Sequence, residues 1–275
     1  MFNKSLPFII LLSILCSCPL LPINKNSVVE KEIFRQQIEQ VDCDGRDRLE
    51  GVQKIFAESG AKPKEIVVER YEKVENVVVT LNGRTNETVI VSAHYDKTTR
   101  GCGAIDNWTG VIIIANLYRI LKTRNNKKTY KFVAFGKEEK GLIGSKTMVK
   151  TIPQSHVKNY CAMINFDSFG FTDLWALGSI SDDKLIELGR VVAKDRNTEF
   201  LIKNFRGASS DSKPFKQMGI PAITISGLGD DWRKFLHQDA DQLVNINIDK
   251  VFENLLFSKE YLFSVDSKPC AFFRN

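Results

Sequence analysis

Histidine is scarce in this chain, with three residues among 275. Beyond residue 18, no two cysteines lie two to four positions apart, which argues against a cysteine-ligated structural zinc and against a CxxC redox centre. The sequence contains no internal repeat and no low-complexity linker. Its formal net charge of +6 is spread along the chain rather than gathered in a basic stripe, so we expect no nucleic-acid partner.

The apolar run at residues 6–15 is too short for a membrane span, which needs about 20 apolar residues. It follows Lys4 and has the shape of a cleaved signal peptide, which we assign to residues 1–18. Residues 15–18 also resemble a bacterial lipoprotein box. We therefore expect an exported protein, periplasmic or extracellular, and the alternative is a lipoprotein anchored to the membrane through Cys18.

Four cysteines remain after the leader, and an even number in an oxidising compartment predicts structural disulfides. They are Cys43, Cys102, Cys161 and Cys270. Three pairings are possible, and we expect one or two structural bridges. Nothing in the sequence indicates an oligomeric state.

The chain is 43% hydrophobic, enough for one substantial core, and residues 28–275 have the length of a single α/β domain. Apolar, β-branched runs predict strands at residues 65–71, 76–81, 88–93, 130–135, 160–166, 173–177, 199–204 and 222–225. Helices are predicted at residues 28–58, 107–122, 142–149, 182–194 and 211–218, and after Asn247. This alternation predicts a three-layer α/β/α fold with a mostly parallel, mixed central sheet.

Five potential metal ligands lie at or near the ends of predicted strands. They are His94, Asp106, Glu139, Asp167 and His237. Imidazole nitrogen and carboxylate oxygen are ligands suited to zinc, and the carboxyl ends of parallel strands meet at one edge of a sheet. The five side chains are enough for two ions that share one carboxylate, so the pattern predicts a two-metal hydrolase.

Two further carboxylates lie beside these ligands. Asp96 is two positions after His94, close enough to orient the imidazole ring. Glu138 precedes Glu139, so one of the pair can bind metal while the other takes a proton from water. The remaining histidine, His156, has no comparable partner nearby, and we expect it on the surface.

Six segments resemble motifs of the dizinc aminopeptidase family, which includes bacterial leucyl aminopeptidase and aminopeptidase Y and has glutaminyl cyclases as relatives. They are SAHYDK, GAIDNWTG, FGKEEKGLIGS, INFDSFG, SSDSKPFKQMGIPAI and FLHQDADQL, in the family's order. The resemblance extends from about Asn76 to the C-terminus and implies two zinc ions bridged by Asp106. His94 and Asp167 then hold one ion. Glu139 and His237 hold the other.

The resemblance also implies that Glu138 is the general base. The chain departs from the family at three places. Ile105 stands where relatives often have a second acidic residue before Asp106. Ser212 stands where they commonly have histidine, which changes the expected substrate pocket. Some relatives supply a tyrosine that polarises the scissile carbonyl, and here Arg206 is the candidate to replace it.

We therefore predict a zinc-dependent exopeptidase that removes N-terminal residues from peptides, with a substrate pocket that includes Trp108, Phe169, Arg206 and Ser210. One alternative is a glutaminyl cyclase with a single functional zinc, although the compact stretch after Glu138 lacks the insertion associated with cyclases. A second alternative is a non-catalytic binding domain, against which the intact Glu138 and the five ligands argue. A third is a carboxypeptidase or aminoacylase-type hydrolase, which also uses paired zinc ions and a carboxylate base. In such a hydrolase Arg206 would clamp the substrate carboxylate.

Overall fold

The computed structural model describes residues 29–274, so the predicted leader and Cys18 lie outside the described residues. Within them, eight strands form one sheet. The strands are β1 (Ile66–Arg70), β2 (Glu75–Leu81), β3 (Thr88–His94), β4 (Thr129–Phe135), β5 (Tyr160–Phe169), β6 (Trp175–Leu177), β7 (Leu201–Lys203) and β8 (Ala222–Gly227). The α-helices are α1 (Lys31–Ile38), α2 (Arg48–Glu58), α3 (Thr109–Lys122), α4 (Ile143–Thr151), α5 (Asp183–Asp195), α6 (Ser212–Gln217) and α7 (Ile248–Ser267).

The sheet has the strand order β1-β2-β4-β3-β5-β8-β6-β7. The four central strands β4, β3, β5 and β8 are parallel, and β2 and β6 flank them in the antiparallel direction. β2 and β3 follow each other in the chain but do not form a hairpin, because β4 lies between them in the sheet. All seven residues of β3 are buried, as expected for a central strand with helices on both faces. The predicted α/β fold with a mixed sheet is confirmed.

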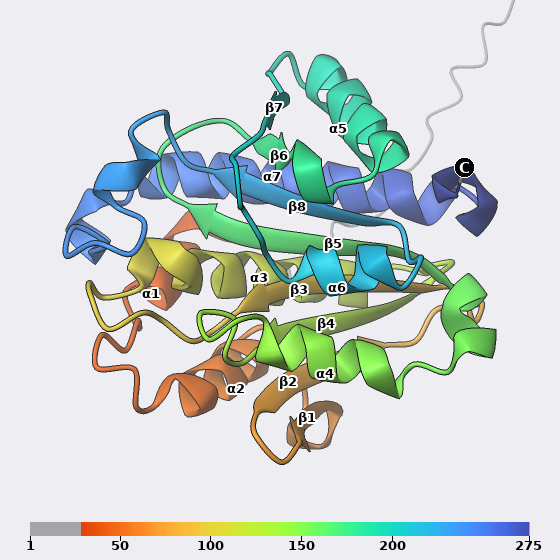
Figure 1. Cartoon of the computed structure of the whole chain (residues 1–275), viewed down its shortest axis with the longest axis horizontal. Helices are drawn as coiled ribbons and strands as arrows, with labels where there is room; N and C mark the ends of the chain where they lie inside the picture. The colour runs from red at the N-terminus through yellow and green to blue at the C-terminus, as the bar shows by residue number, and fades with distance from the viewer. Residues whose placement is uncertain (1–28, 275) are drawn as a thin grey trace, which may run out of the picture.

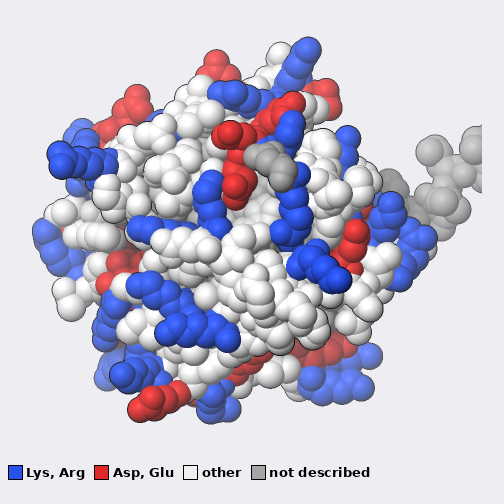
Figure 2. All heavy atoms as spheres, turned by 45° about the vertical axis from the view of Figure 1, so that its right-hand side comes forward, with Lys and Arg blue, Asp and Glu red and all other residues white. Residues whose placement is uncertain are grey.

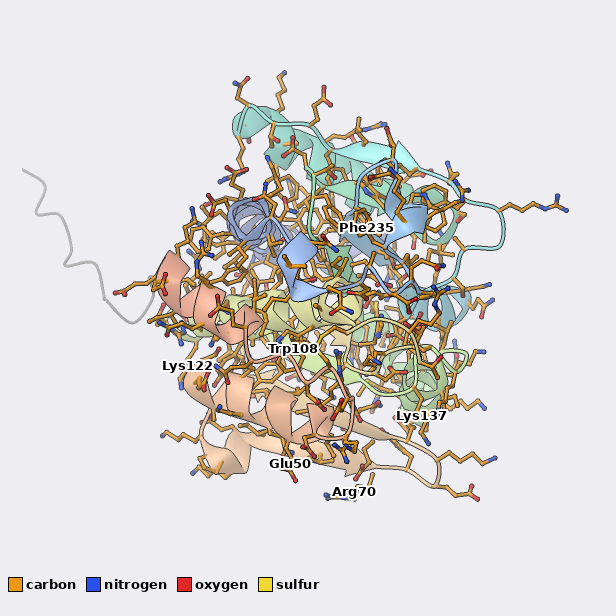
Figure 3. All side chains as sticks on the ribbon, turned by 90° about the vertical axis from the view of Figure 1, so that its left-hand side faces the viewer. Glu50, Arg70, Trp108, Lys122, Lys137 and Phe235 are labelled. Carbon is orange, nitrogen blue, oxygen red and sulfur yellow. A yellow bond between two sulfur atoms is a disulfide. The ribbon has the colours of Figure 1, made fainter. Side chains whose placement is uncertain are left out.

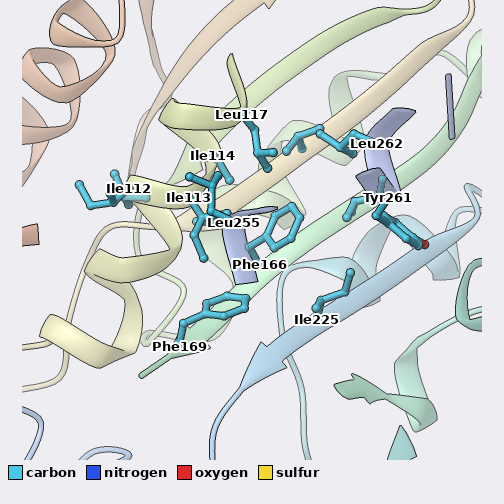
Figure 4. Close-up of a cluster of buried hydrophobic side chains, with 14 of the residues drawn as sticks. Ile112, Ile113, Ile114, Leu117, Phe166, Phe169, Ile225, Leu255, Tyr261 and Leu262 are labelled. Carbon is cyan, nitrogen blue, oxygen red and sulfur yellow. The ribbon is translucent and has the colours of Figure 1, made fainter. Parts of the chain in front are cut away.

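Helices cover both faces of the sheet (Figure 1). In this view α4 and α6 lie in front of it, and α3 and α7 lie behind it. The larger core lies behind the sheet, where Ile113 and Leu117 of α3 meet Phe166 of β5 and Leu255 of α7 (Figure 4). A smaller core fills the space between the sheet and the two front helices. The central strands are thereby fixed on both sides, and so are the loops at their carboxyl ends.

The predicted helical lead-in at residues 28–58 is divided into α1 and α2 by a turn at residues 39–47. This turn contains Gly45 with a φ of 76°, a left-handed conformation that favours glycine and ends the helical pattern. It also contains Cys43, which forms a disulfide with Cys102. A second disulfide joins Cys161 to Cys270. In the described part of the chain all four cysteines predicted to form bridges are therefore paired.

Charged side chains of both signs are interspersed with broad neutral areas on the face shown in Figure 2. This distribution agrees with the spread of charge expected from the sequence. Among residues 29–274, no helix is both long enough and apolar enough to cross a membrane.

Candidate active site

Most of the predicted metal ligands lie at the carboxyl ends of the parallel strands. His94 is the last residue of β3, Asp167 lies near the end of β5, and Glu139 follows β4. Asp106 comes from the loop after β3, and His237 comes from the loop after β8. In Figure 1 this is the left end of the sheet, toward which β5 points and beside which the blue loop after β8 lies. The topology therefore gathers residues from four separate segments at one edge.

Asp106 is the centre of this group. One of its oxygens, Oδ1, lies 3.1 Å from His94 Nε2, and the other, Oδ2, lies 3.3 Å from His237 Nε2. His94 Nε2 is also 3.6 Å from Asp167 Oδ1. His237 Nε2 is 3.1 Å from Glu139 Oε2. The donors thus form two sets, each with one imidazole and one further carboxylate, and Asp106 belongs to both.

The donor set fits divalent metal ions. His94 and Asp106 are almost fully buried, and Glu139 Oε1 is a buried oxygen with no hydrogen-bond partner among residues 29–274. Hydrogen bonds to Asp106 and Glu139 raise the pKa of His237 to about 10, so the site favours positive charge. Buried carboxylates at this density need a compensating cation. Zinc binds this combination of imidazole and carboxylate ligands.

Asp96 holds the neighbouring loop as well as the histidine. Its carboxylate accepts hydrogen bonds from the backbone N–H of Glu138 (2.9 Å) and of Glu139 (3.2 Å). His94 Nδ1 lies 3.2 Å from the main-chain oxygen of Asp96 and 3.7 Å from its carboxylate. Both the carbonyl and the carboxylate of Asp96 thus lie beside the ring, and the orienting role of Asp96 stays a prediction. The carboxylate also positions the backbone of the two glutamates.

Two serines complete the polar surroundings. Ser168 Oγ lies 3.0 Å from an oxygen of Asp106 and 3.0 Å from an oxygen of Asp167. Ser210 Oγ donates to the other oxygen of Asp167. Ser168 and His237 have left-handed backbone conformations, with φ of 65° and 58°, which are rare for residues other than glycine. Strained conformations of this kind often accompany functional sites.

A cavity of about 580 Å³ opens beside these groups. One group of lining residues, here called the metal-ligand wall, consists of His94, Asp106, Glu138, Glu139, Asp167 and His237. A second group, here called the aromatic wall, consists of Trp175, Phe205, Leu228 and Trp232. The Phe205 ring centroid lies 5.6 Å from that of Trp175 and 5.0 Å from that of Trp232, so the three rings form a continuous apolar surface.

Two of the four predicted pocket residues line the cavity, and two do not. Arg206 and Ser210 lie on it. The prediction for Trp108 and Phe169 is wrong, because both side chains are fully buried in the core. Trp108 lies between α2 and α3 (Figure 3), where its indole N–H donates to the carbonyl of Gln37. Phe169 packs in the core behind the sheet (Figure 4).

Three residues that support the site were not predicted from the sequence. Asp241 accepts hydrogen bonds from the backbone N–H of Ile105 and Asp106. Arg48 is a buried guanidinium that donates to four backbone carbonyls. Asp211 is fully buried, and burial raises its pKa to about 7. Asp211 and Asp241 lie inside segments that resemble the family, which was the available signal, but Arg48 lies outside them.

Comparison with known proteins agrees with this geometry. The sequence model of Peptidase family M28 matches residues 76–256. The chain belongs to this family. The family M28 region contains all five predicted metal ligands and Glu138, and it begins after the turn that carries Cys43.

Individual relatives differ in how much of their length this M28 chain spans. A probable leucine aminopeptidase of Arthroderma otae is 30% identical over 230 residues, which are 75% of this chain and 61% of the relative. The zinc aminopeptidase BSAP of Bacillus subtilis has a TM-score of 0.63 at 24% identity, over 71% of this chain and 50% of that one. A glutaminyl cyclase of an Acidobacteriales bacterium has a TM-score of 0.69 at 15% identity, over 95% of this chain and 99% of the cyclase. The chain thus spans 61% and 50% of the length of these two aminopeptidases.

Proposed function

We propose that this protein is a zinc-dependent aminopeptidase that binds two zinc ions. The observation that carries the proposal is the placement of Asp106, whose two oxygens face different histidines. Asp106 would bridge the ions, with His94 and Asp167 holding one of them. Glu139 and His237 would hold the other. The names of the leucine aminopeptidase and zinc aminopeptidase relatives support the same activity.

Glu138 is the proposed general base. When bound, zinc ions polarise a scissile carbonyl and acidify water. Glu138 lines the cavity beside the ligands, and its backbone is fixed by Asp96. Burial, together with the charges of Asp211 and Asp167, raises the pKa of Glu138 well above its ordinary value. A carboxylate with raised proton affinity can accept a proton from water and deliver it to the departing amine.

The cavity supports a substrate with an apolar N-terminal side chain. The aromatic wall and the metal-ligand wall line the same cavity of about 580 Å³, which is large enough for one bulky residue and the adjoining peptide unit. Leu228 and Trp232 provide apolar contacts there. A leucine- or phenylalanine-like side chain would lie against this wall while its peptide carbonyl lies at the proposed metal site, beside Glu138.

Export is part of the proposal. Two disulfides in the described residues support an oxidising compartment, because cytosolic thiols are kept reduced. The segment at residues 1–18 would direct the export, with Cys18 as a candidate site of lipid attachment. Mass spectrometry of the mature protein tests this, since cleavage shortens the N-terminus and a diacylglycerol group adds a defined mass to Cys18.

Glutaminyl cyclisation is the second candidate function. It is supported by the likeness of the fold to that of a glutaminyl cyclase, which has a TM-score of 0.69 over 95% of this chain. That reaction needs a glutamine side chain to reach its own N-terminal amine in the cavity, and it needs no water. The two functions therefore differ in product, although both would use the metal-ligand wall.

The test uses protein that lacks residues 1–18, stripped with a chelator and reloaded with zinc. The substrates are leucine p-nitroanilide, its N-acetylated form and a glutaminyl peptide. We expect zinc-dependent cleavage of the unblocked anilide only. Glu138→Gln should bind the same amount of zinc and lose about 10³-fold in kcat.

The three outcomes separate the candidates. Cleavage of the acetylated substrate at an equal rate would contradict an aminopeptidase, because such an enzyme recognises the free amine. Pyroglutamate formation without cleavage would assign the protein to the cyclases. Full activity of Glu138→Gln would contradict the proposed base, whichever substrate is used.

A further inference from the structure

The loop that carries Asp106 is attached to a segment far away in the sequence. Cys102 lies four residues before Asp106 and forms a disulfide with Cys43, in the turn between α1 and α2. Cys43 lies outside residues 76–256, which match the family. The N-terminal turn is therefore a covalent neighbour of the proposed metal-bridging residue.

Arg48, at the start of α2, reinforces this attachment. Its buried guanidinium donates to the carbonyls of Asp42 (2.9 Å), Tyr95 (3.0 Å), Cys102 (2.5 Å) and Gly103 (3.0 Å). Tyr95 directly follows His94. One planar group thus connects the Cys43 turn to the backbone beside two of the proposed ligands, and the guanidinium fork suits such multiple contacts.

Asp241 holds the same loop from its other side. Its carboxylate accepts from the N–H of Ile105 (2.7 Å) and, more weakly, from that of Asp106 (3.3 Å). Its main-chain carbonyl accepts from the N–H of Cys102 (2.6 Å). Asp241 lies four residues after His237, so the loops of two proposed ligands are joined. Burial lowers the pKa of the Arg48 guanidinium, and the negative charge of Asp241 counteracts this effect.

The fit around this loop is close. A Cβ added at Gly101 would lie 2.4 Å from the carbonyl oxygen of Gln238, and one added at Gly103 would lie 2.9 Å from the Arg48 guanidinium. Both glycines also have left-handed φ angles, of 66° and 65°. The loop therefore has little freedom as long as its attachments persist.

We propose that Cys43, Cys102, Arg48 and Asp241 form a clamp that positions Asp106 and His94, and that the affinity for metal depends on the redox state of the Cys43–Cys102 bond. The proposal rests on the metal site described under the proposed function. Cys43 lies on an exposed turn and Cys102 is buried, so a reductant can reach the bond from the Cys43 side. An added dithiol supplies two electrons and two protons, leaves two thiols, and becomes a disulfide itself.

Reduction of the Cys43–Cys102 bond should make the loop that carries Asp106 more mobile. The proposed metal site should persist, because the hydrogen bonds of Arg48 and Asp241 remain. Groups that orient metal ligands typically change metal affinity by about 10- to 100-fold when they are removed. We therefore expect the dissociation constant for zinc to rise by about 10-fold or more when the bond is absent. The Cys161–Cys270 bond should have no such effect. Cys161 lies six residues before Asp167 on β5, which is about 20 Å of extended chain from that ligand.

The experiment compares the double variant Cys43→Ala/Cys102→Ala with the control variant Cys161→Ala/Cys270→Ala. Zinc dissociation constants are measured by competition with a chromogenic chelator, and unfolding midpoints are recorded for all proteins. The absorption spectrum of the cobalt-substituted proteins reports the geometry of the ligands. We expect weaker zinc binding and an altered cobalt spectrum for the first variant only, although both lose a stabilising cross-link.

Equal changes in both variants, or in neither, would overturn the proposal. If the oxidised wild-type protein itself bound no zinc, the proposed function would fail instead, so the two failures are distinguishable. If the first variant does not fold, Arg48→Lys serves in its place, since it keeps the charge but loses the fork. Its control is Arg119→Lys, because Arg119 also donates to a carbonyl, that of Glu58 at the end of α2. Wild-type zinc affinity in Arg48→Lys would then contradict the clamp.

Discussion

On the metal-ligand wall of the cavity the side chains are fixed by hydrogen bonds from several elements. The aromatic wall is held mainly by contacts among rings, together with a hydrogen bond from the Trp175 indole N–H to the carbonyl of Leu228. Asp106 and Asp167 both lie within hydrogen-bond distance of Ser168. Phe205 belongs to a loop and only touches its neighbours Trp175 and Trp232. The first wall is therefore suited to chemistry that requires fixed geometry, and the second is suited to substrates of varying shape.

The largest effect is expected from Asp106→Asn on the metal-ligand wall. An amide cannot bring a negative charge to both donor sets, so both proposed ions lose a ligand. We expect kcat/KM for leucine p-nitroanilide to fall by about 10³-fold or more, with loss of bound zinc. Metal analysis of the dialysed protein together with kinetics tests this. Asp239→Asn is the matched control, because Asp239 lies near His237 in sequence but is exposed and pairs with Arg100. Full zinc content in Asp106→Asn would contradict the assignment.

Asp211, buried behind the same wall, should make the metal-free protein sensitive to pH. Burial raises its folded-state pKa to about 7, above the unfolded-state value near 4. The folded state then holds a proton that the unfolded state has lost, so stability falls as the pH rises from about 4 to 7. Asp211→Asn should remove a difference on the order of 1–3 kcal/mol between pH 5 and pH 8.

Urea unfolding at the two pH values tests the Asp211 prediction. Chelator-stripped wild-type protein should gain less stability than Asp211→Asn when the pH is raised from 5 to 8. Asp195→Asn provides the control, because it makes the same substitution at an exposed position. Identical pH dependence of Asp211→Asn and wild-type protein would show that ionisation of Asp211 does not cause the loss of stability at higher pH.

A change on the aromatic wall should affect substrates selectively. Trp232→Ala removes a ring that contacts Phe205 and lines the cavity. We expect kcat/KM for a leucine substrate to fall by about 10- to 30-fold, mostly through KM, because apolar contacts are worth roughly 1–3 kcal/mol in such pockets. An alanine substrate should lose less than about threefold, and zinc content should not change. An equal loss for leucine and alanine would place Trp232 outside the side-chain pocket.

The contrast between the walls also explains what could be predicted from the sequence. His94 and Asp167 directly end or interrupt apolar runs, and the parallel order of β3 and β5 follows from the helices between strands. That pattern was enough to predict the fold and to bring the ligands to one edge. It did not predict that α1 and α2 are separate, since their division depends on a turn that bonds to Cys102.

The aromatic wall could not be predicted in this way. Phe205 and Trp232 lie in loops without a periodic pattern, and their proximity depends on how two loops fold over the sheet edge. Trp108, two residues after Asp106, was predicted from the sequence to lie in the pocket. Its side chain points into the core, where it lies 5.8 Å from the Arg48 guanidinium. Closeness along the chain was misleading there because the side chains of neighbouring residues in a loop point in different directions.

The smallest effect is expected from Arg206→Ala, which tests whether the aromatic wall contributes any charge to catalysis. Arg206 lines the cavity, but its residue is exposed on the loop that also holds Phe205. An exposed guanidinium interacts weakly with a developing oxyanion, because water screens it. We expect kcat to change by less than about threefold, whereas a fixed oxyanion donor would be worth about 10²- to 10³-fold. Steady-state kinetics on leucine p-nitroanilide distinguishes these outcomes.

A loss of about 10²-fold or more in kcat would mean that the loop closes over the substrate and that Arg206 replaces the tyrosine of some relatives. The difference between the two walls would then disappear once substrate is bound.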